Sequence, residues 1–322
     1  MTSTETDRRR YFGVWRQVEN DYQVWEVDGN RAIRFGDMNA KNVNAHNLDI
    51  EIGKIFEVAI VEKITSIVGN FKWEVAEMRL PPGAYHPRMA RPMHLNPTEP
   101  ASHFIGASEL KHEYAIIIEK IKSLLNKLAE ICRFVHPDGP SLAAYGHEIR
   151  NLLILTCTEV ESHWRSILKA NKVNIRNYST SDYLLLKDAM KLGDYSITFN
   201  LYPWLPPLAP FENWGISGSP TKDIPWYDAY NAVKHHREEN FARGTLEATL
   251  NAVAACAIMV CAQFGNDNPI RSMNGLIGLR KAPTWYFPEF YIFAMYKSPT
   301  VRISYSFPVD RKKRESKSKP HG

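Results

Sequence analysis

The chain has 322 residues, of which 44% are hydrophobic and 23% charged, and its formal net charge is +5. A chain of this length and composition can bury a substantial core, so wholesale disorder is excluded. Residues 310–322 hold six basic and two acidic residues, a net charge of +4. Residues 1–309 therefore carry only +1 of the total of +5, and they show no polyanion-binding signature.

Residues 1–80 are predicted to contain a β-hairpin and a helix. Segments 23–27 and 32–35 flank the turn Asp28-Gly29-Asn30, where glycine supplies the positive φ that a hairpin turn requires. Residues 52–68 then repeat apolar positions every three or four residues, which predicts a helix with one buried face.

Residues 81–108 are predicted to be a proline-rich loop, because six prolines between residues 80 and 103 interrupt regular backbone hydrogen bonding. His86, His94 and His103 lie in this segment. Their spacing matches no common metal site, so we interpret them as loop histidines.

Residues 109–265 are predicted to form a helical bundle. Long amphipathic helices are expected over 109–134 and 142–170, then a short helix capped by Ser181 or Asp182 and a strand over 195–201. A proline-rich aromatic loop over 203–220 should pack on the bundle. A helix starting near Asp223 follows. The last helix, 246–264, is capped by Thr245 and apolar on nearly all sides, which places it at the centre.

Residues 266–309 are expected to contribute strands, over 286–296 and 301–307, that pack on the bundle and join the amino-terminal hairpin. The predicted fold class is therefore mainly α: a helical bundle with a small accessory β-sheet from the N- and C-terminal segments. The basic tail, 310–322, is predicted to be disordered and solvated, with contact to nucleic acid or another anion as the alternative.

A cytoplasmic protein without membrane contact is expected. The first ten residues are polar, unlike a secretory signal, and the apolar run over 252–262 is too short to span a bilayer. Four cysteines lie within apolar helical patterns and include no Cys-x-x-Cys pair: Cys132, Cys157, Cys256 and Cys261. This pattern predicts reduced core thiols rather than a zinc site.

The residues best suited to chemistry lie on the helix that starts near Asp223. Tyr227, Asn231 and His235 are four residues apart and share one face, with Lys234 beside them. A neutral imidazole next to an amide, a phenol and a cation suits proton transfer in phosphodiester chemistry. The alternative is structural, since such rows also satisfy buried polar groups inside bundles. Trp226, Tyr230 and Val233 are expected to anchor this helix in the core.

The helix over 142–170 carries the polar residues expected to face this row: His147, Arg150, Asn151, Thr158 and Glu161. Glu159 and His163 are also four residues apart, and an isolated pair at this spacing is interpreted as a surface contact. A carboxylate-bridged metal centre would need Glu-x-x-His on paired helices. That spacing is not repeated in this sequence, so no metal is expected.

The segment Tyr230-Asn231-Ala232-Val233-Lys234-His235 follows two long amphipathic helices and precedes an apolar one. In this it resembles the HEPN superfamily of helical bundles, whose usual signature is Arg-Asn-x-x-x-His. Asn231 and His235 match that signature, whereas Tyr230 stands in the arginine position. The resemblance covers about residues 109–264. Segments 156–164 and 225–235 also resemble a group of uncharacterised bacterial proteins, a likeness that implies no activity.

The HEPN resemblance implies a metal-independent endoribonuclease or RNA-binding effector of a bacterial toxin or anti-phage defence type, acting as a homodimer without a cofactor. His235 would assist attack of the ribose 2′-hydroxyl, Asn231 would orient the reacting groups, and a cation would stabilise the negative charge. Lys234, Arg150 or Arg237 would supply that cation in place of the missing arginine. The residues expected to contact RNA are Tyr227, Tyr230, Arg237 and His147. The alternative is a non-enzymatic helical protein that binds a protein partner, such as an antitoxin, or a nucleic acid.

Overall fold

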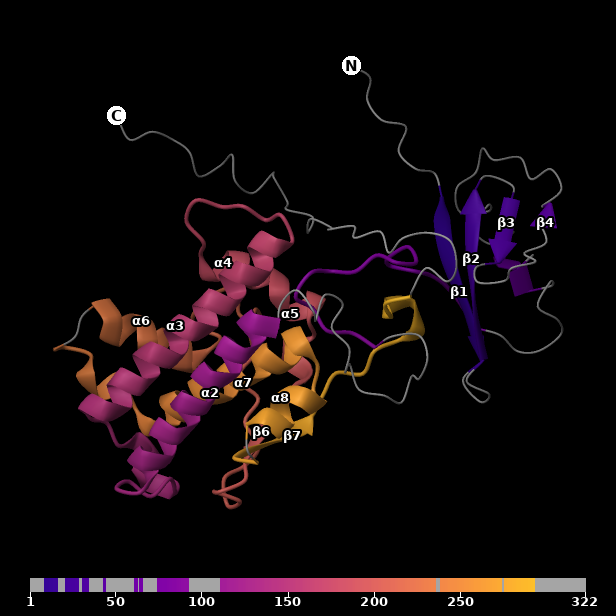
Figure 1. Ribbon diagram of the computed structural model, residues 1–322. Helices are drawn as coiled ribbons and strands as arrows, with labels where there is room; N and C mark the ends of the chain where they lie inside the picture. The colour runs from indigo at the N-terminus through magenta and orange to yellow at the C-terminus, as the bar shows by residue number, and fades with distance from the viewer. Residues whose placement is uncertain are drawn as a thin grey trace, which may run out of the picture. The chain divides into compact units, whose positions relative to one another are not determined.

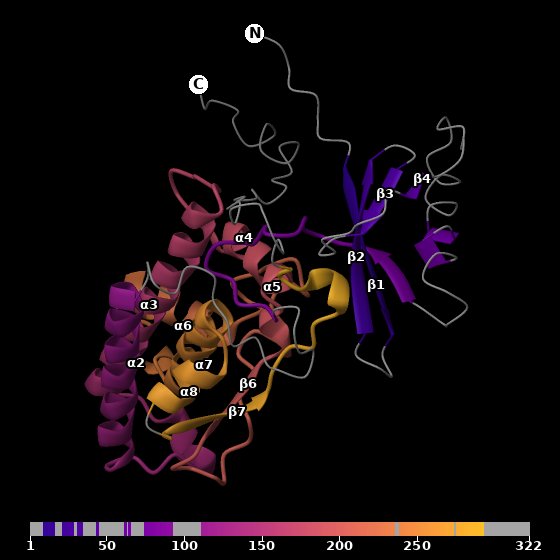
Figure 2. The ribbon, with the colours of Figure 1, turned by 45° about the vertical axis from the view of Figure 1, so that its right-hand side comes forward.

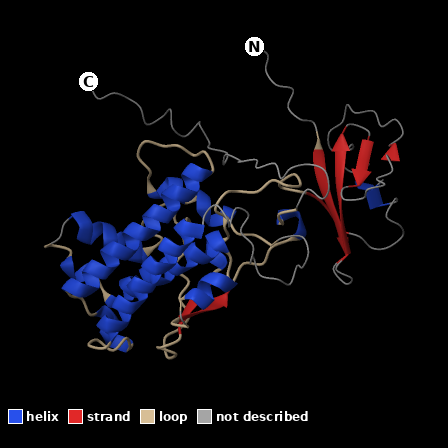
Figure 3. Cartoon of the chain, in the orientation of Figure 1, coloured by secondary structure: helices blue, strands red, loops and turns tan. Residues whose placement is uncertain are grey.

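The structure is a computed structural model that describes residues 9–16, 21–28, 31–34, 43–44, 61–62, 64–65, 74–92, 111–235, 238–273 and 275–292. The chain divides into two units. One comprises Met1–Tyr85, Arg91–Pro100 and Trp285–Ile303, and the other His86–Ala90, Ala101–Thr284 and Ser304–Gly322. The described residues are rich in helices and also form two small antiparallel sheets (Figure 3).

Five antiparallel strands form the sheet of the first unit, in the order β4-β3-β2-β1-β5. Their bounds are Arg10–Arg16 (β1), Asp21–Asp28 (β2), Arg31–Arg34 (β3), Val43–Asn44 (β4) and Glu74–Glu77 (β5). The predicted hairpin is confirmed, because β2 pairs with β3 in antiparallel register. The sequence pattern did not indicate β1 and β5, which pair with each other beside β2.

Alternation along the strands separates two apolar faces of this sheet. One face carries the buried cluster of Phe12, Val14, Trp25, Val27 and Ile64. Ile64 comes from the predicted helix over 52–68, of which the structure describes four helical residues. Gly13 points to the opposite face, where an added Cβ would lie 2.7 Å from both Met78 and Phe287. Glycine at this position therefore allows both side chains to approach the strand.

The strand expected over residues 286–296 is wrong where the structure describes it. Phe287–Glu289 form the 3-10 helix η4 instead. Pro288 lacks the N–H that a strand ladder needs, and the carboxylate of Glu289 accepts a hydrogen bond from the Tyr286 N–H at 3.1 Å. All five strands of the sheet come from residues 10–77. Residues 293–309 and the tail over 310–322 lie outside the described residues.

Four long helices dominate the second unit and confirm the predicted order of helices. They are α2 (Lys111–Cys132), α3 (His147–Ala170), α6 (Pro225–His235) and α7 (Leu246–Phe264). Helix α7 packs against the other three and lies among them in both views (Figures 1 and 2). Helix α3 begins at His147 rather than at residue 142, because Gly139–Ala143 form the 3-10 helix η1 after a proline-rich turn.

Helix α7 is the core helix that its composition predicts. The Thr245 side chain accepts a hydrogen bond from the Ala248 N–H at 3.2 Å, which confirms the predicted cap. By length and composition the helix could cross a membrane, but 89% of it is buried inside the protein, as in a core helix. Its many alanines let α3 pack closely against it.

Shorter elements connect the long helices. They are α4 (Thr180–Tyr183), α5 (Leu185–Ala189), η2 (Leu192–Asp194), β6 (Ser196–Phe199), η3 (Phe241–Arg243), α8 (Asp267–Ser272) and β7 (Ile277–Lys281). The cap of α4 is Ser179, not Ser181 or Asp182, because its N–H and hydroxyl both donate to the Asp182 carboxylate at 2.8 Å. The strand predicted over 195–201 is confirmed as β6, and its antiparallel partner is β7.

The proline-rich loop over 203–220 packs on the bundle, as predicted, through buried Phe211 and Trp214. The indole of Trp214 stacks on that of Trp164 from α3, with ring centroids 5.1 Å apart. Trp164 is fully buried and also contacts Tyr183 and Tyr227, at centroid distances of 4.8 and 5.3 Å. Trp164 is therefore the centre of an aromatic cluster that joins α3, α6 and the loop.

The cysteines behave as the sequence predicts. Cys132, Cys157, Cys256 and Cys261 are all free and buried. Burial raises the pKa of each thiol. They are therefore protonated core side chains near neutral pH rather than nucleophiles.

Candidate functional site

The motif residues lie on α6, which the core holds in a defined orientation. Trp226, Tyr230 and Val233 are buried, as predicted, and the Trp226 indole N–H donates to the Pro210 carbonyl at 3.0 Å. These three residues share one face of α6 at helical spacing, which leaves the opposite face for polar groups. His235 is the last residue of the helix.

His235 is exposed at this last turn, and Asn231, one turn earlier, is half-buried. The spacing of four residues places both on the same face of α6. Within the part of the chain that the structure describes, no hydrogen bond joins the two side chains. Arg237 lies outside the described residues. The imidazole that the sequence singles out is therefore reachable by solvent.

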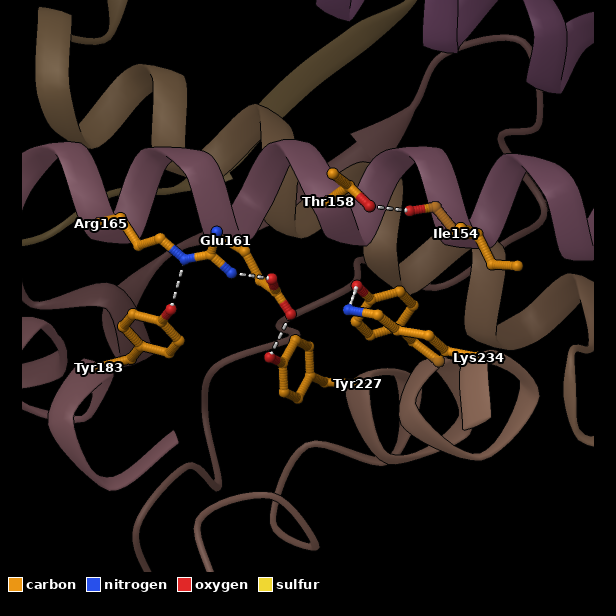
Figure 4. Close-up of polar contacts among 8 residues, drawn as sticks. Ile154, Thr158, Glu161, Arg165, Tyr183, Tyr227 and Lys234 are labelled. Carbon is orange, nitrogen blue, oxygen red and sulfur yellow. Dashed lines mark hydrogen bonds and ion pairs between the residues drawn. The ribbon is translucent and has the colours of Figure 1, made fainter. Parts of the chain in front are cut away.

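Lys234 lies next to His235 and is held in place by Tyr230. Its Nζ donates to the Tyr230 hydroxyl at 2.7 Å and lies 4.8 Å from the centroid of the same ring (Figure 4). This hydrogen bond raises the pKa of Lys234. The residue in the usual arginine position thus binds a cation that lies one turn away.

Tyr227 faces the core rather than the solvent and joins a network on α3 (Figure 4). Its hydroxyl donates to Glu161 Oε1 at 2.7 Å, and Glu161 Oε2 accepts from Arg165 at 2.5 Å. Arg165 Nε donates to the Tyr183 hydroxyl at 2.9 Å. Burial raises the pKa of Tyr227, so the phenol keeps its proton and donates. Hydrogen bonds from Tyr227 and Arg165 offset the free-energy cost of burying the Glu161 carboxylate.

The start of α3 presents a second group of candidate residues around Phe241. The Arg150 guanidinium lies over the Phe241 ring, 5.2 Å from its centroid, and the rings of His147 and Tyr145 lie 4.9 and 5.7 Å from it. Arg150 also donates to Asn151 Oδ1 at 3.2 Å. We call Tyr145, His147, Arg150 and Phe241 the Phe241 cluster.

Gly244 lies against both the Phe241 cluster and α6. A Cβ at Gly244 would lie 3.4 Å from the aliphatic stem of Arg150 and 3.5 Å from Val233. Arg150 and Val233 therefore pack on the same short backbone segment, and Val233 precedes Lys234. The structure thus brings Arg150 to the carboxy-terminal end of α6. It gives no direct contact between Arg150 and His235 in the described residues.

The sequence pattern did not indicate a group of three charged residues that includes Asp228 of α6. Asp228 forms ion pairs with Lys222 at 2.9 Å and with Arg243 at 2.5 Å. Asp228 precedes Asn231 by three residues and His235 by seven, so it continues their row. The spacing of Asp228 from Asn231 and His235 can be recognised in the sequence. Its ion pair with Arg243 cannot, because that contact depends on the position of η3 in the fold.

The surface contact expected for Glu159 and His163 is wrong, because His163 is only 5% exposed. Glu159 instead accepts from Lys120 Nζ at 3.0 Å. His163 Nδ1 lies 3.0 Å from Gln263 Nε2, while Gln263 Oε1 accepts from Arg88 at 3.3 Å. The amide nitrogen therefore faces the imidazole, and Nδ1 accepts its hydrogen bond. Desolvation, with the nearby charges of Arg88 and Lys120, lowers the pKa of His163 to about 3.

This burial predicts a loss of stability in mild acid. The unfolded chain protonates His163 below its ordinary pKa of 6.5, whereas the folded protein keeps it neutral until about pH 3. Stability from this group is complete above pH 6.5 and falls as the pH drops towards 3, by about 2 kcal/mol at pH 5. The free energy of unfolding of wild type and of His163→Gln, measured with urea at pH 7 and pH 5, tests this expectation. The variant should lose about 2 kcal/mol less over this interval, and an equal loss in both proteins would contradict the assignment.

The described residues contain no group of three or more His, Cys, Asp or Glu side chains placed to hold a metal ion. Comparison with known proteins adds no further assignment: no family model, curated protein or solved structure matches the chain.

Proposed function

We propose that this protein binds RNA and cleaves it without a metal ion, as a HEPN-like effector of a bacterial toxin or anti-phage defence type. The observation that carries the proposal is the exposed imidazole of His235 at the end of α6, directly after Lys234 in the sequence, whose ammonium group is held by Tyr230. A proton acceptor and a cation within reach of one phosphodiester are the groups that this chemistry requires. The resemblance to the HEPN motif supports the same assignment.

In the proposed reaction, His235 takes the proton of a ribose 2′-hydroxyl as that oxygen attacks the adjacent phosphorus. The bond from phosphorus to the 5′-oxygen of the next nucleotide breaks, and the products carry a 2′,3′-cyclic phosphate and, once protonated, a 5′-hydroxyl. Asn231 orients the ribose or phosphate from one turn earlier. Lys234 stabilises the charge on the phosphate oxygens, and its bond to Tyr230 restricts where the ammonium group lies.

The Phe241 cluster suits contact with unpaired RNA next to this centre. Tyr145 is 54% exposed and His147 is exposed, so both rings are open to stacking by bases. Arg150 adds a positive charge that Phe241 holds in place. We propose Arg237 as a further RNA contact, completion of the site by a second copy of the chain, and control by a protein partner such as an antitoxin.

Incubation of purified protein with single-stranded RNA in EDTA tests the proposal. We expect cleavage with 2′,3′-cyclic phosphate ends, because the attacking group is the 2′-hydroxyl. DNA of the same sequence lacks this group and should stay intact, which makes it the matched control substrate. Absence of cleavage across a set of unstructured RNAs, or cleavage of the DNA as well, would reject the proposed reaction.

A non-enzymatic interaction protein is the second candidate, and the exposed aromatic surface favours it. Trp204, in the proline-rich loop, is 49% exposed and stacks on His136 at 4.8 Å. Phe134, two residues before His136, is 89% exposed. We propose that these exposed aromatic groups form part of a contact surface. Binding of one ligand by wild type and a His235 variant alike, with no RNA cut by either, would favour this candidate.

A further inference from the structure

A pocket of about 380 Å³ lies between the proline-rich loop and the first turns of α6 and α7. This volume suits a small ligand or a single inserted side chain. Its apolar lining includes Pro210, Trp226, Ala229 and Ala248. Since the pocket is at the amino-terminal end of α6 and His235 at the other end, its occupant does not depend on the proposed RNA cleavage.

Two charged residues that line the pocket are already engaged by the fold. The Asp223 carboxylate accepts from the backbone N–H groups of Gly215 at 2.8 Å and Ser217 at 3.2 Å, and from the Ser217 hydroxyl. Arg243 pairs with Asp228 at 2.5 Å. Asp223 therefore holds the loop in place, and Arg243 is engaged by Asp228, a carboxylate that it shares with Lys222.

Two of the remaining lining residues, Glu247 and Asn251, offer acceptors. Glu247 is exposed at the first turn of α7, and its carboxylate has no hydrogen bond or ion pair in the part of the chain described by the structure. Asn251 donates its Nδ2 to the Glu247 carbonyl at 3.0 Å, which leaves its Oδ1 as an acceptor. The pocket thus combines apolar walls with an uncompensated negative charge.

We infer that this pocket binds an organic cation, an ammonium or guanidinium group carried on a short apolar chain. The chain would lie against the Trp226 and Pro210 side, and the charged head would donate to Glu247 and Asn251. An anion is disfavoured, because the unpaired Glu247 carboxylate would repel it and the Arg243 guanidinium is already bound to Asp228. The same chemistry is offered by a free alkylamine or alkylguanidine and by an arginine or lysine side chain of another protein.

Calorimetric titration of the full-length protein with butylguanidinium and with butylurea tests the inference. The two compounds have similar shape, but only the first is charged. We expect the guanidinium to bind at least roughly tenfold more tightly, and Glu247→Gln to remove that difference. Ala248→Leu should weaken binding of the guanidinium because the added carbons fill the pocket. Glu212→Gln, in the same loop but outside the pocket, is the matched control and should bind as wild type does.

Equal affinities for the two compounds, no binding of the guanidinium, or unchanged binding by Glu247→Gln would each overturn the inference. Circular dichroism confirms that the variants are folded. A second titration compares the free guanidinium with a short capped peptide that contains one arginine. Tighter binding of the peptide identifies a protein side chain as the occupant, whereas tighter binding of the free compound identifies a small molecule.

Discussion

Replacing His235 with alanine is expected to lower the rate of RNA cleavage by about 100-fold to 10,000-fold, the usual contribution of a general base. The imidazole is the only group on the exposed end of α6, among the described residues, that we assign to proton removal. Because His235 is exposed, its loss leaves no cavity in the core. The far-ultraviolet circular dichroism spectrum and the melting temperature should therefore stay at wild-type values. Cleavage rates are measured in EDTA with an excess of enzyme over RNA.

The control for this experiment is His112→Ala, which removes another exposed histidine, at the start of α2. It should cleave RNA at the wild-type rate. A folded His235→Ala protein with wild-type activity would show that the imidazole is not the base. If His235→Ala unfolds the protein, the residue is structural, contrary to its position on the surface.

Replacing Trp164 with alanine is expected to destabilise the second unit by about 3–5 kcal/mol, as measured by urea unfolding. The side chain is fully buried and contacts rings from three other segments, through Tyr183, Trp214 and Tyr227. Alanine would leave a cavity and remove aromatic pairs worth about 0.5–1.5 kcal/mol each. Trp164→Phe should cost less, because it keeps a ring and removes an indole N–H that has no partner among the described residues.

Trp204→Ala is the matched control, since it makes the same substitution at a tryptophan that is 49% exposed. Its indole N–H donates to the Pro137 carbonyl at 2.9 Å, and we expect a loss of about 1 kcal/mol for that bond. Equal losses in the two variants would show that the aromatic cluster around Trp164 does not govern stability.

The amphipathic patterns predicted the long helices, because the spacing of apolar residues is a local property of the chain. The sequence pattern also predicted Thr245 as a cap and the all-round apolar character of α7. Strand β5 was not predicted, because its pairing with β1 depends on a contact across about 60 residues of sequence. Strand β1 was also not predicted, although it pairs with its sequence neighbour β2. Likewise, η4 replaced an expected strand where Pro288 interrupts the ladder.

For the candidate site, the sequence by itself determined which residues share a face of α6, since helical spacing places Asn231 and His235 together wherever the helix lies. Only the tertiary structure decided what each side chain meets. Tyr227 and Glu161 are 66 residues apart, and His163 and Gln263 are 100 apart, yet both pairs are buried and hydrogen-bonded. The physical reason is that burial sets the strength of a polar contact and the pKa of its groups, and burial depends on which segments pack together.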